Sequence, residues 1–328
     1  MAEPAVLGQD LCLAMDIGGT KTIVALVARS GQLVAKTLFE TLPDAEAQLE
    51  RCVLEAQKLC EESELESERI AGIGVNVPGL ADNGKGELVY APYRGWRNVR
   101  VRDFLKWYWP NARIEIANDV NACALAETMY GAGRGKSHLL WVTVSTGIGS
   151  GIIANGEIYE GSCGAAGELG HVIVEWSDGS LCGCGNKGCL EAQASGTAIA
   201  RMAAKRCSED QAASSDLADY FRRSGAKIDA LNVANAARDG IGEAIEIYEQ
   251  AGMYLGRALS YAINLFNPEC VVIGGGVSLS FELMEKKMRE VIAESVIGEQ
   301  NVNTPVILTS LGYNAAVIGA ASLVFYKC

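Results

Sequence analysis

An acidic residue followed by two glycines gives the start of the chain the composition of a phosphate-binding turn. Asp16, Gly18, Gly19, Thr20 and Lys21 lie within six residues. Glycine lets a backbone approach a phosphate closely and take a positive φ, a threonine hydroxyl is a further donor, and a carboxylate holds Mg²⁺ through water. We therefore expect this turn to bind nucleotide phosphates with Mg²⁺, although Gly-Gly is also common in ordinary β-hairpins.

Two more glycine-rich segments have the same character. The segment 143–151 reads TVSTGIGSG, and a glycine triplet at 274–276 ends an apolar run. The segment 143–151 is followed by an apolar run and not by the helix that a dinucleotide-binding turn requires. The GxxxxGK[ST] pattern of P-loop proteins is absent from the sequence. Open α/β sheets bind ligands at the carboxyl ends of strands. We expect the nucleotide to contact Thr146, Gly147, Gly274, Gly275 and Gly276.

One histidine and three cysteines have the composition of a metal site. His171, Cys182, Cys184 and Cys189 form the pattern H-x10-C-x-C-x4-C, and the chain has only 2 histidines. Imidazole and thiolate are ligands of tetrahedral Zn²⁺, and four protein ligands leave no open position, so the predicted zinc is structural. The alternative is three free thiols in a glycine-rich loop.

The elements that position these residues alternate between strands and helices. Apolar runs broken by glycine or serine predict strands, and apolar residues at three- and four-residue steps predict helices. The first half predicts strands at 11–16, 21–28, 32–39, 70–75 and 113–117 and helices at 44–65 and 120–130; the second predicts strands at 139–144, 151–154, 270–274 and 306–309, with a hairpin at 155–156. This order predicts an α/β fold.

The two halves share one plan, in which a strand ends at a glycine-rich hairpin. This occurs first at 16–20 and again at 145–149. We interpret the repetition as an internal duplication that forms two lobes with a ligand cleft between them. The expected lobes are 1–118 together with a closing segment 314–328, and 119–313 with the metal cluster.

Composition favours a folded enzyme of two domains. The chain has 328 residues, of which 49% are hydrophobic and 21% charged, and a formal net charge of −12 with lysine and arginine spread along it. The absence of a basic face disfavours nucleic-acid binding. Segment 1–10 lacks the pattern of a secretory signal, and the longest apolar run is too short to span a membrane. The chain has an odd number of cysteines, 11, most of them scattered in apolar stretches, which disfavours a disulfide framework. We expect a cytoplasmic protein.

Seven motifs in order resemble those of the ROK family (repressors, open reading frames, kinases) of the actin-like ATPase superfamily, especially its glucokinases. They are DIGGTKT (16–22), NVPGL (76–80), GWRNV (95–99), NDVNACALAE (118–127), GELGH (167–171), CGCGNKGCLE (182–191) and VVIGGG (271–276). The resemblance implies a two-lobed actin-like ATPase (ribonuclease H-like) fold. It also implies an ATP-dependent hexose kinase, first of all a glucokinase, with ATP, Mg²⁺ and structural Zn²⁺, and a homodimer.

The resemblance also implies roles for individual residues. Asp119 corresponds to the general base that accepts the proton of the sugar hydroxyl, and its neighbour Asn118 to a sugar ligand. One positioned carboxylate suffices because phosphoryl transfer depends on positioning and charge neutralisation. The alternative for this Asn-Asp pair is a helix N-cap. Further residues that resemble sugar ligands of the family are Gly79, Glu168, His171 and Glu191.

Two departures and two rival functions remain open. Ser145 stands where this loop often has glycine, and Arg94 stands where an apolar residue is more familiar, so Arg94 could favour a substituted or anionic sugar. An N-acetylhexosamine kinase, for N-acetylglucosamine or N-acetylmannosamine, shares the metal pattern. A sugar-responsive regulator of the family needs an N-terminal helix-turn-helix, and only about ten residues precede the first expected strand. We therefore expect hexose and ATP as partners, without nucleic acid or membrane.

Overall fold

The computed structural model describes residues 11–64, 70–92, 94–208 and 215–326. Segment 1–10, which is not expected to be a secretory signal, and Leu65, the last residue of an expected helix, lie outside the described residues. The chain forms two compact units. The first contains residues 1–137, 151–166 and 310–328, and the second contains 138–150 and 167–309.

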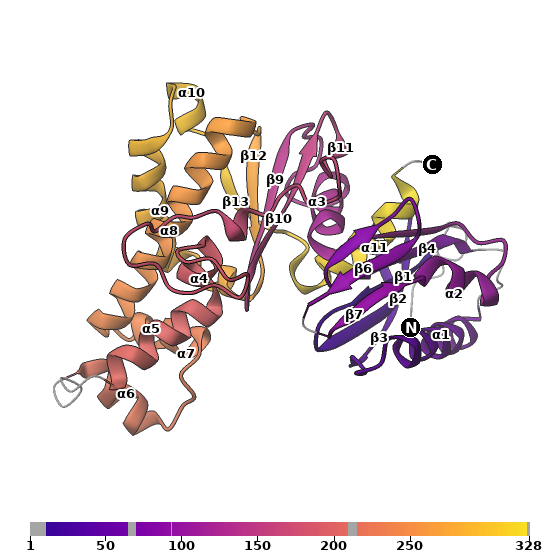
Figure 1. The fold of residues 1–328 in the computed structure, drawn as a ribbon, viewed down its shortest axis with the longest axis horizontal. Coiled ribbons are helices and arrows are strands. Elements are labelled where there is room, and N and C mark those ends of the chain that lie inside the picture. Colours follow the sequence, from indigo (N-terminus) through magenta and orange to yellow (C-terminus); the bar gives the residue numbers. More distant parts are fainter. Residues whose placement is uncertain (1–10, 65–69, 93, 209–214, 327–328) are drawn as a thin grey trace. The chain divides into compact units, whose positions relative to one another are not determined.

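The first unit is built on a five-stranded sheet with the order β3-β2-β1-β4-β8 (Figure 1). β1, β2 and β3 form the predicted antiparallel meander, and β4 and β8 run parallel to β1. All five predicted strands of this half are present, with bounds that differ by one or two residues at most ends: β1 (Leu11–Ile17), β2 (Lys21–Ala28), β3 (Leu33–Glu40), β4 (Ile70–Val77) and β8 (Ile114–Asn118).

Helices cover both faces of this sheet because its strands alternate apolar side chains between two cores. Leu13 and Met15 of β1 pack with α1 (Ala45–Glu62) and α2 (Val101–Tyr108), whereas Cys12 and Ala14 pack with α11 (Ala315–Phe325). Side chains of successive strand residues point to opposite faces, so one strand supplies both cores. Asp44, in the predicted cap region of the first helix, accepts a hydrogen bond from the N–H of Ala47.

The closing helix α11 approaches the sheet closely because β4 carries glycines where it crosses. A Cβ at Gly74 would collide with the backbone of Ala320, and one at Gly72 would meet the side chain of Val324. Gly319 of α11 lies equally close to the backbone of Ala122 in α3 (Asp119–Met129). These contacts join β4, α3 and α11 into one packed layer behind the candidate base.

This packing explains why the boundary of the first unit differs from the expected one at residue 118. Ala122 and Leu125 of α3 share a hydrophobic cluster with Leu323 of α11, which places 119–137 in the first unit. A small antiparallel sheet of this unit was not predicted from the sequence. Its strands are β5 (Leu80–Asp82), β6 (Glu87–Ala91) and β7 (Trp96–Val99).

A second five-stranded sheet has the order β11-β10-β9-β12-β13. β12 pairs in parallel with β9 and with β13, and β10 and β11 form an antiparallel pair around the predicted turn at 155–156. The bounds are β9 (Leu139–Val144), β10 (Ile148–Ala154), β11 (Glu157–Ile158), β12 (Cys270–Gly274) and β13 (Val306–Leu308).

The second unit is rich in helices. α8 and α9 lie side by side (Figure 1), because Gly252 and Gly256 of α8 let the backbone of α9 approach at Met284 and Met288. None of the helices in the described parts of the chain has the length and apolar character of a membrane span. The helices are α4 (Leu190–Ala194), α5 (Gly196–Ser208), α6 (Asp216–Ser224), α7 (Ala230–Arg238), α8 (Gly242–Phe266), α9 (Glu282–Ser295) and α10 (Glu299–Val302), with 3₁₀ helices η3 (Leu169–His171) and η5 (Gly276–Ser280); η6 (Gly312–Asn314) precedes α11.

Candidate functional site

The first glycine turn lies between β1 and β2, as predicted. The N–H of Gly18 donates to the carbonyl of Lys21 over 3.0 Å, which closes the turn. Neither Gly18 nor Gly19 adopts a positive φ, so that part of the expectation is wrong. Gly18 is needed for space, because a Cβ there would lie 2.8 Å from the Lys21 carbonyl oxygen, whereas at Gly19 a Cβ would have no heavy atom of the described residues outside its chain neighbours within 4 Å. The open side at Gly19 leaves room for a phosphate to approach the backbone.

Thr41, the residue that follows β3, supports this turn. Its hydroxyl donates to the Gly18 carbonyl over 2.9 Å, and its N–H donates to the Thr20 carbonyl over 3.0 Å. The carbonyl of Thr41 accepts a hydrogen bond of 3.2 Å from Nη2 of Arg94, the residue that departs from the familiar pattern. Arg94 therefore binds Thr41, the residue that supports the first glycine turn. The effect of Arg94 on the choice of sugar stays a prediction.

Asp16, the second-last residue of β1, lies beside the turn in an environment that disfavours its charge. Burial raises the pKa of its carboxyl from 3.8 to about 7, the negative charge of Asp119 adds to the rise, and a hydrogen bond from Asn76 opposes it. Nδ2 of Asn76 lies 3.3 Å from Oδ1 of Asp16 and also donates to the carbonyl of Ala316 over 2.6 Å. A bound cation would relieve this cost by favouring the carboxylate.

Asn118 and Asp119 lie where β8 ends and α3 begins. Asn118 is the N-cap of α3, since its side chain accepts the N–H of Val120 over 2.9 Å, so the cap interpretation is confirmed for Asn118. Its Nδ2 donates over 2.9 Å to the carbonyl of Gly79, which has a φ of 133°. Burial raises the pKa of Asp119, although hydrogen bonds from backbone N–H groups oppose the rise. The structure thus brings Asp16, Gly79, Asn118 and Asp119 into one unit, with two carboxylates close enough to repel.

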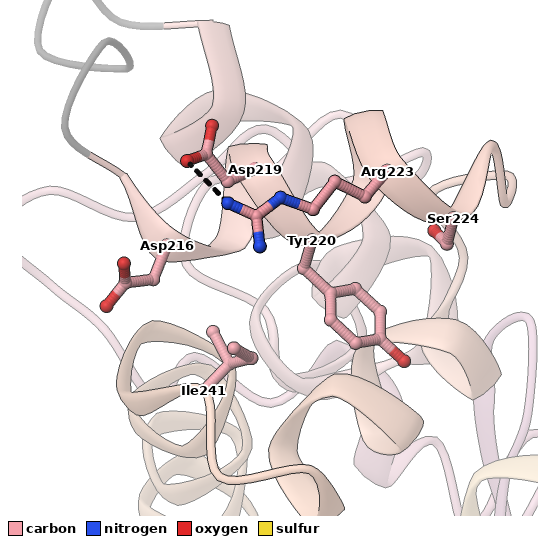
Figure 2. A pocket seen from close by; sticks show the side chains of 6 residues that line it. All are labelled: Asp216, Asp219, Tyr220, Arg223, Ser224 and Ile241. Atoms are coloured by element: carbon pink, nitrogen blue, oxygen red, sulfur yellow. Dashed lines mark ion pairs between the residues drawn. The ribbon is translucent and has the colours of Figure 1, made fainter.

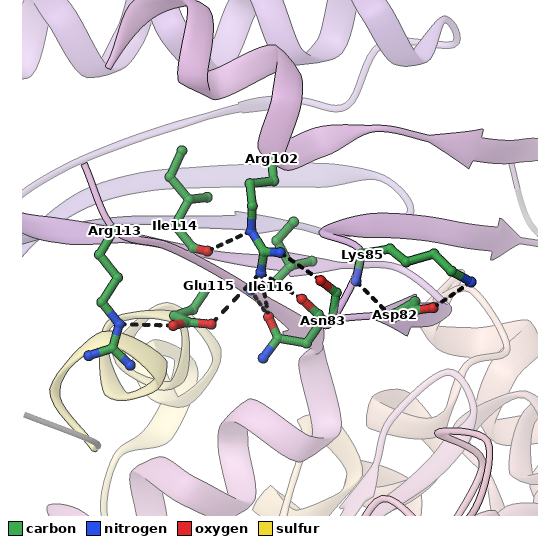
Figure 3. Close-up of polar contacts among 9 residues, drawn as sticks. Asp82, Asn83, Lys85, Arg102, Arg113, Ile114, Glu115 and Ile116 are labelled. Carbon is green, nitrogen blue, oxygen red and sulfur yellow. Dashed lines mark hydrogen bonds and ion pairs between the residues drawn. The ribbon is translucent and has the colours of Figure 1, made fainter. Parts of the chain in front are cut away.

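A polar network behind β8 was missed by the sequence reasoning (Figure 3). Arg102 of α2 donates from Nε to the Ile114 carbonyl over 3.0 Å and from Nη2 to the Asn83 carbonyl over 2.6 Å. The side chain of Asn83 accepts the N–H of Ile116 over 3.0 Å. These bonds join the turn after β5 to the strand that ends in Asn118. Arginine and asparagine at this spacing match no short motif, so only the fold reveals the network.

In the second unit, the second and third glycine segments meet at the carboxyl ends of β9 and β12. Gly274 pairs with Thr143 in parallel register. Gly275 has a φ of 90°, and a Cβ there would collide with the carbonyl oxygen of Val144. A Cβ at Gly276 would lie 3.9 Å from Oγ of Ser145, which places that hydroxyl beside the triplet. The predicted nucleotide residues of this unit therefore lie together at the carboxyl ends of β9 and β12.

The four predicted metal ligands converge in the same unit. The candidate ligand atoms of His171, Cys182, Cys184 and Cys189 all lie within 4.8 Å of one another. Nδ1 of His171 is 3.6 Å from Sγ of Cys182, and the two remaining sulfur atoms are 3.6 Å apart. Hydrogen bonding from the backbone of Asn186 lowers the pKa of Cys184, which favours a thiolate. One imidazole and three thiols at these separations fit tetrahedral Zn²⁺.

Two predicted sugar ligands lie at the edge of this cluster. Nε2 of His171 is 3.9 Å from Oε2 of Glu168, whose side chain is 66% exposed. The two ring nitrogens therefore face different groups, one the cysteines and the other the exposed carboxylate. An exposed carboxylate accepts two hydroxyl donors, which suits a sugar.

A surface pocket of about 410 Å³ lies elsewhere in the second unit (Figure 2). It is formed by α6 and the start of α8, and Nη2 of Arg223 lies 3.9 Å from Oδ2 of Asp219. None of the predicted site residues lines it; the lining residues are Asp216, Asp219, Tyr220, Arg223, Ser224 and Ile241.

Known proteins resemble this chain over nearly its whole length. A glucokinase of Thermotoga maritima is 35% identical over 318 residues, which cover 95% of this chain and 96% of the relative. The crystal structure of a ROK family glucokinase from Streptomyces griseus in complex with glucose and AMPPNP has a TM-score of 0.80 and 30% identity, and the match covers 95% of this chain and 98% of that one. A xylose repressor of Bacillus subtilis is 30% identical over 255 residues, which cover 78% of this chain and 61% of the repressor.

These similarities confirm the fold expected from the sequence, the actin-like ATPase fold of sugar kinases. A family model described as ROK family matches residues 12–327. Because the family model covers almost every described residue, the chain belongs to the ROK family.

Proposed function

We propose that this protein is an ATP-dependent hexose kinase that converts D-glucose and ATP to glucose 6-phosphate and ADP. The observation that carries the proposal is the placement of Asp119 at the start of α3, with its pKa raised by burial and its neighbour Asn118 bound to Gly79. Glucokinases at 29–35% identity over 95% of this chain support glucose as the substrate.

Asp119 is proposed as the general base. Its carboxylate accepts the proton of a sugar hydroxyl while the hydroxyl oxygen attacks the γ-phosphorus of ATP and ADP leaves. A base is most effective when its pKa lies near the working pH, and burial shifts that of Asp119 upward. Asn118 and Gly79 are proposed to orient the sugar, since the side chain of the first is fixed on the carbonyl of the second.

Asp16 is proposed to hold Mg²⁺ of Mg·ATP through water. The proposed phosphate contacts are backbone and hydroxyl donors of Gly18, Gly19 and Thr20, together with Lys21, and of Thr146, Gly147 and the triplet 274–276. Backbone N–H groups suit this task in a chain with a net charge of −12, because they supply local positive potential without basic side chains.

Glu168, His171 and Glu191 are proposed as ligands of the other sugar hydroxyls. The cluster of His171 and three cysteines is proposed to hold Zn²⁺, which supplies structure and no chemistry because all four positions are taken by protein. His171 belongs to both groups, since Nδ1 faces the cysteines and Nε2 faces Glu168. A homodimer is also proposed, and light scattering after size-exclusion chromatography measures its mass.

An assay of ADP release tests the proposal. Wild-type protein with Mg·ATP is offered glucose, mannose, fructose, N-acetylglucosamine and N-acetylmannosamine, and glucose is expected to give the highest kcat/KM. Asp119→Ala should lower kcat by about 10²–10⁴, the usual contribution of a general base, while Asp103→Asn on the exposed face of α2 should not change it. Turnover that survives Asp119→Ala, or ADP release with none of the hexoses, contradicts the proposal.

A further inference from the structure

The second glycine loop, residues 145–148, is held in place by the segment that follows the metal cluster. The N–H of Gly196 donates to the Ser145 carbonyl over 2.7 Å. The hydroxyl of Thr197 donates to the Thr146 carbonyl over 2.8 Å. Each of the first two residues of the loop therefore has its carbonyl bound by the start of α5.

Glu191 binds the other end of the same loop. Its Oε2 accepts the N–H of Ile148 over 3.0 Å, and its Oε1 lies 3.8 Å from Sγ of Cys182. A Cβ at Gly147 would collide with Oε2 of Glu191, so glycine is required at this position for the carboxylate to reach the backbone. One side chain thus contacts both the glycine loop and a candidate metal ligand.

The segment 189–197 is itself fixed by the cluster. Cys189 is buried and precedes α4 directly, and the N–H of Leu190 donates to the carbonyl of Val172 over 2.9 Å, next to His171. The sequence reasoning assigned Glu191 to the sugar alone, and Thr197 was not considered. Their contacts instead run to the loop that carries two predicted nucleotide ligands.

We propose that Glu191 and Thr197 are positioning residues for the nucleotide, which hold the loop 145–148 in its binding conformation. The inference rests on the proposed kinase function and deepens it: the segment after the metal cluster sets the affinity for Mg·ATP as well as for the sugar. A glycine-rich loop loses much conformational entropy when it binds a phosphate. Bonds made before the ligand arrives remove part of that cost and so raise affinity.

Thr197 gives the cleaner test, because its exposed side chain bonds to the loop and has no proposed role in sugar binding. In Thr197→Val the dissociation constant of Mg·AMPPNP, measured by titration calorimetry, should rise about fivefold, the usual effect of one lost hydrogen bond. Thr197→Ser should restore wild-type nucleotide affinity, and the glucose dissociation constant should not change in either variant. Ser208→Ala, which removes a hydroxyl-to-carbonyl bond at the other end of α5, is the matched control.

Glu191 gives the second test. Glu191→Gln can still accept the N–H of Ile148, so nucleotide affinity should stay within about twofold of wild type while glucose affinity falls. Glu191→Ala should weaken both. Glu243→Gln is the matched control, since that carboxylate also accepts a backbone N–H, from Leu217, and lies in the same unit. Zinc content is measured in each variant, so that a loss of affinity is compared only among proteins with the metal content of the wild type.

The outcomes separate the inference from the function on which it rests. Wild-type nucleotide affinity in both Thr197→Val and Glu191→Ala overturns the inference, even if the wild-type enzyme phosphorylates glucose. Weaker nucleotide binding in Thr197→Val with unchanged glucose binding supports it. A wild-type protein that binds neither Mg·AMPPNP nor any hexose refutes the proposed function and the inference with it.

Discussion

Replacing Asp16 with asparagine should stabilise the ligand-free protein while it removes the activity. In the folded chain the carboxyl of Asp16 has a pKa of about 7 because burial and the nearby charge of Asp119 disfavour its ionised form. Asparagine keeps the shape and a hydrogen-bonding oxygen without the charge. No lysine or arginine pairs with Asp16 in the described part of the chain, so the substitution breaks no ion pair.

The sign and size of the effect follow from the pKa. A folded-state pKa above the unfolded value means that the folded chain binds protons more tightly, so stability falls as the pH rises from about 4 to about 7. A rise from 3.8 to about 7 corresponds to roughly 4 kcal/mol if the whole shift is realised. Because Asp16 keeps some contact with solvent, we expect about 2 kcal/mol. The advantage of Asp16→Asn should be small below pH ~4, grow as the pH rises from about 4 to about 7, and be constant above pH ~8.

Thermal unfolding of both proteins at several pH values measures this difference. Asp103→Asn, which changes an exposed carboxylate of the same unit, should show no pH-dependent gain. Saturating Mg·ATP should narrow the gap, since a cation near Asp16 favours its ionised form in the wild type. The reasoning is refuted if Asp16→Asn is no more stable than wild type at pH 8, or if its advantage is as large at a pH below ~4 as at pH 8.

Three further perturbations test other parts of the structure. Removing the metal with a chelator should raise the KM for the sugar and lower the melting temperature, because Glu168 and Glu191 flank the cluster; unchanged KM and melting temperature in metal-free protein count against this. Arg102→Ala should lower kcat by about tenfold with little change in nucleotide KM, because it releases the strand that ends in Asn118. A rise in nucleotide KM as large as the fall in kcat would instead indicate a general loss of structure. Gly74→Ala should cost about 2 kcal/mol or more in urea unfolding because its Cβ would collide with α11, and a stability equal to wild type would show that the helix can move away.

The sequence was most informative where periodicity and glycine placement agree. The meander of β1, β2 and β3 and the strand that leads into Asn118 were predicted because short apolar runs bounded by turn residues are typical of strands. The cap at Asp44 was predicted because an aspartate precedes the apolar helical pattern. The metal cluster was predictable because its ligands are close in the sequence, and four such side chains within the 19 residues 171–189 converge in the structure.

The remaining features depend on contacts between distant segments. The strands β5, β6 and β7 are three to five residues long, and such short runs carry little periodicity. The partners of Arg102 lie 12 to 19 residues away in sequence, so the network could not be read from spacing. Gly18 was predicted for close approach to a phosphate and for a positive φ; its φ is not positive, and the structure requires it for space beside the Lys21 carbonyl, which depends on the folded backbone.

The free-energy cost of ionising the Asp16 carboxyl bears on function, because this chain has both kinase and repressor relatives. A chain that only binds a sugar gains nothing from a carboxylate whose charge is disfavoured by burial and by a second carboxylate. The cost is relieved when the cation of a metal–nucleotide complex arrives, because a nearby cation stabilises the ionised form of Asp16. Asp16 beside the open glycine turn, together with a pKa of Asp119 raised toward neutral pH, therefore favours phosphoryl transfer over sugar sensing.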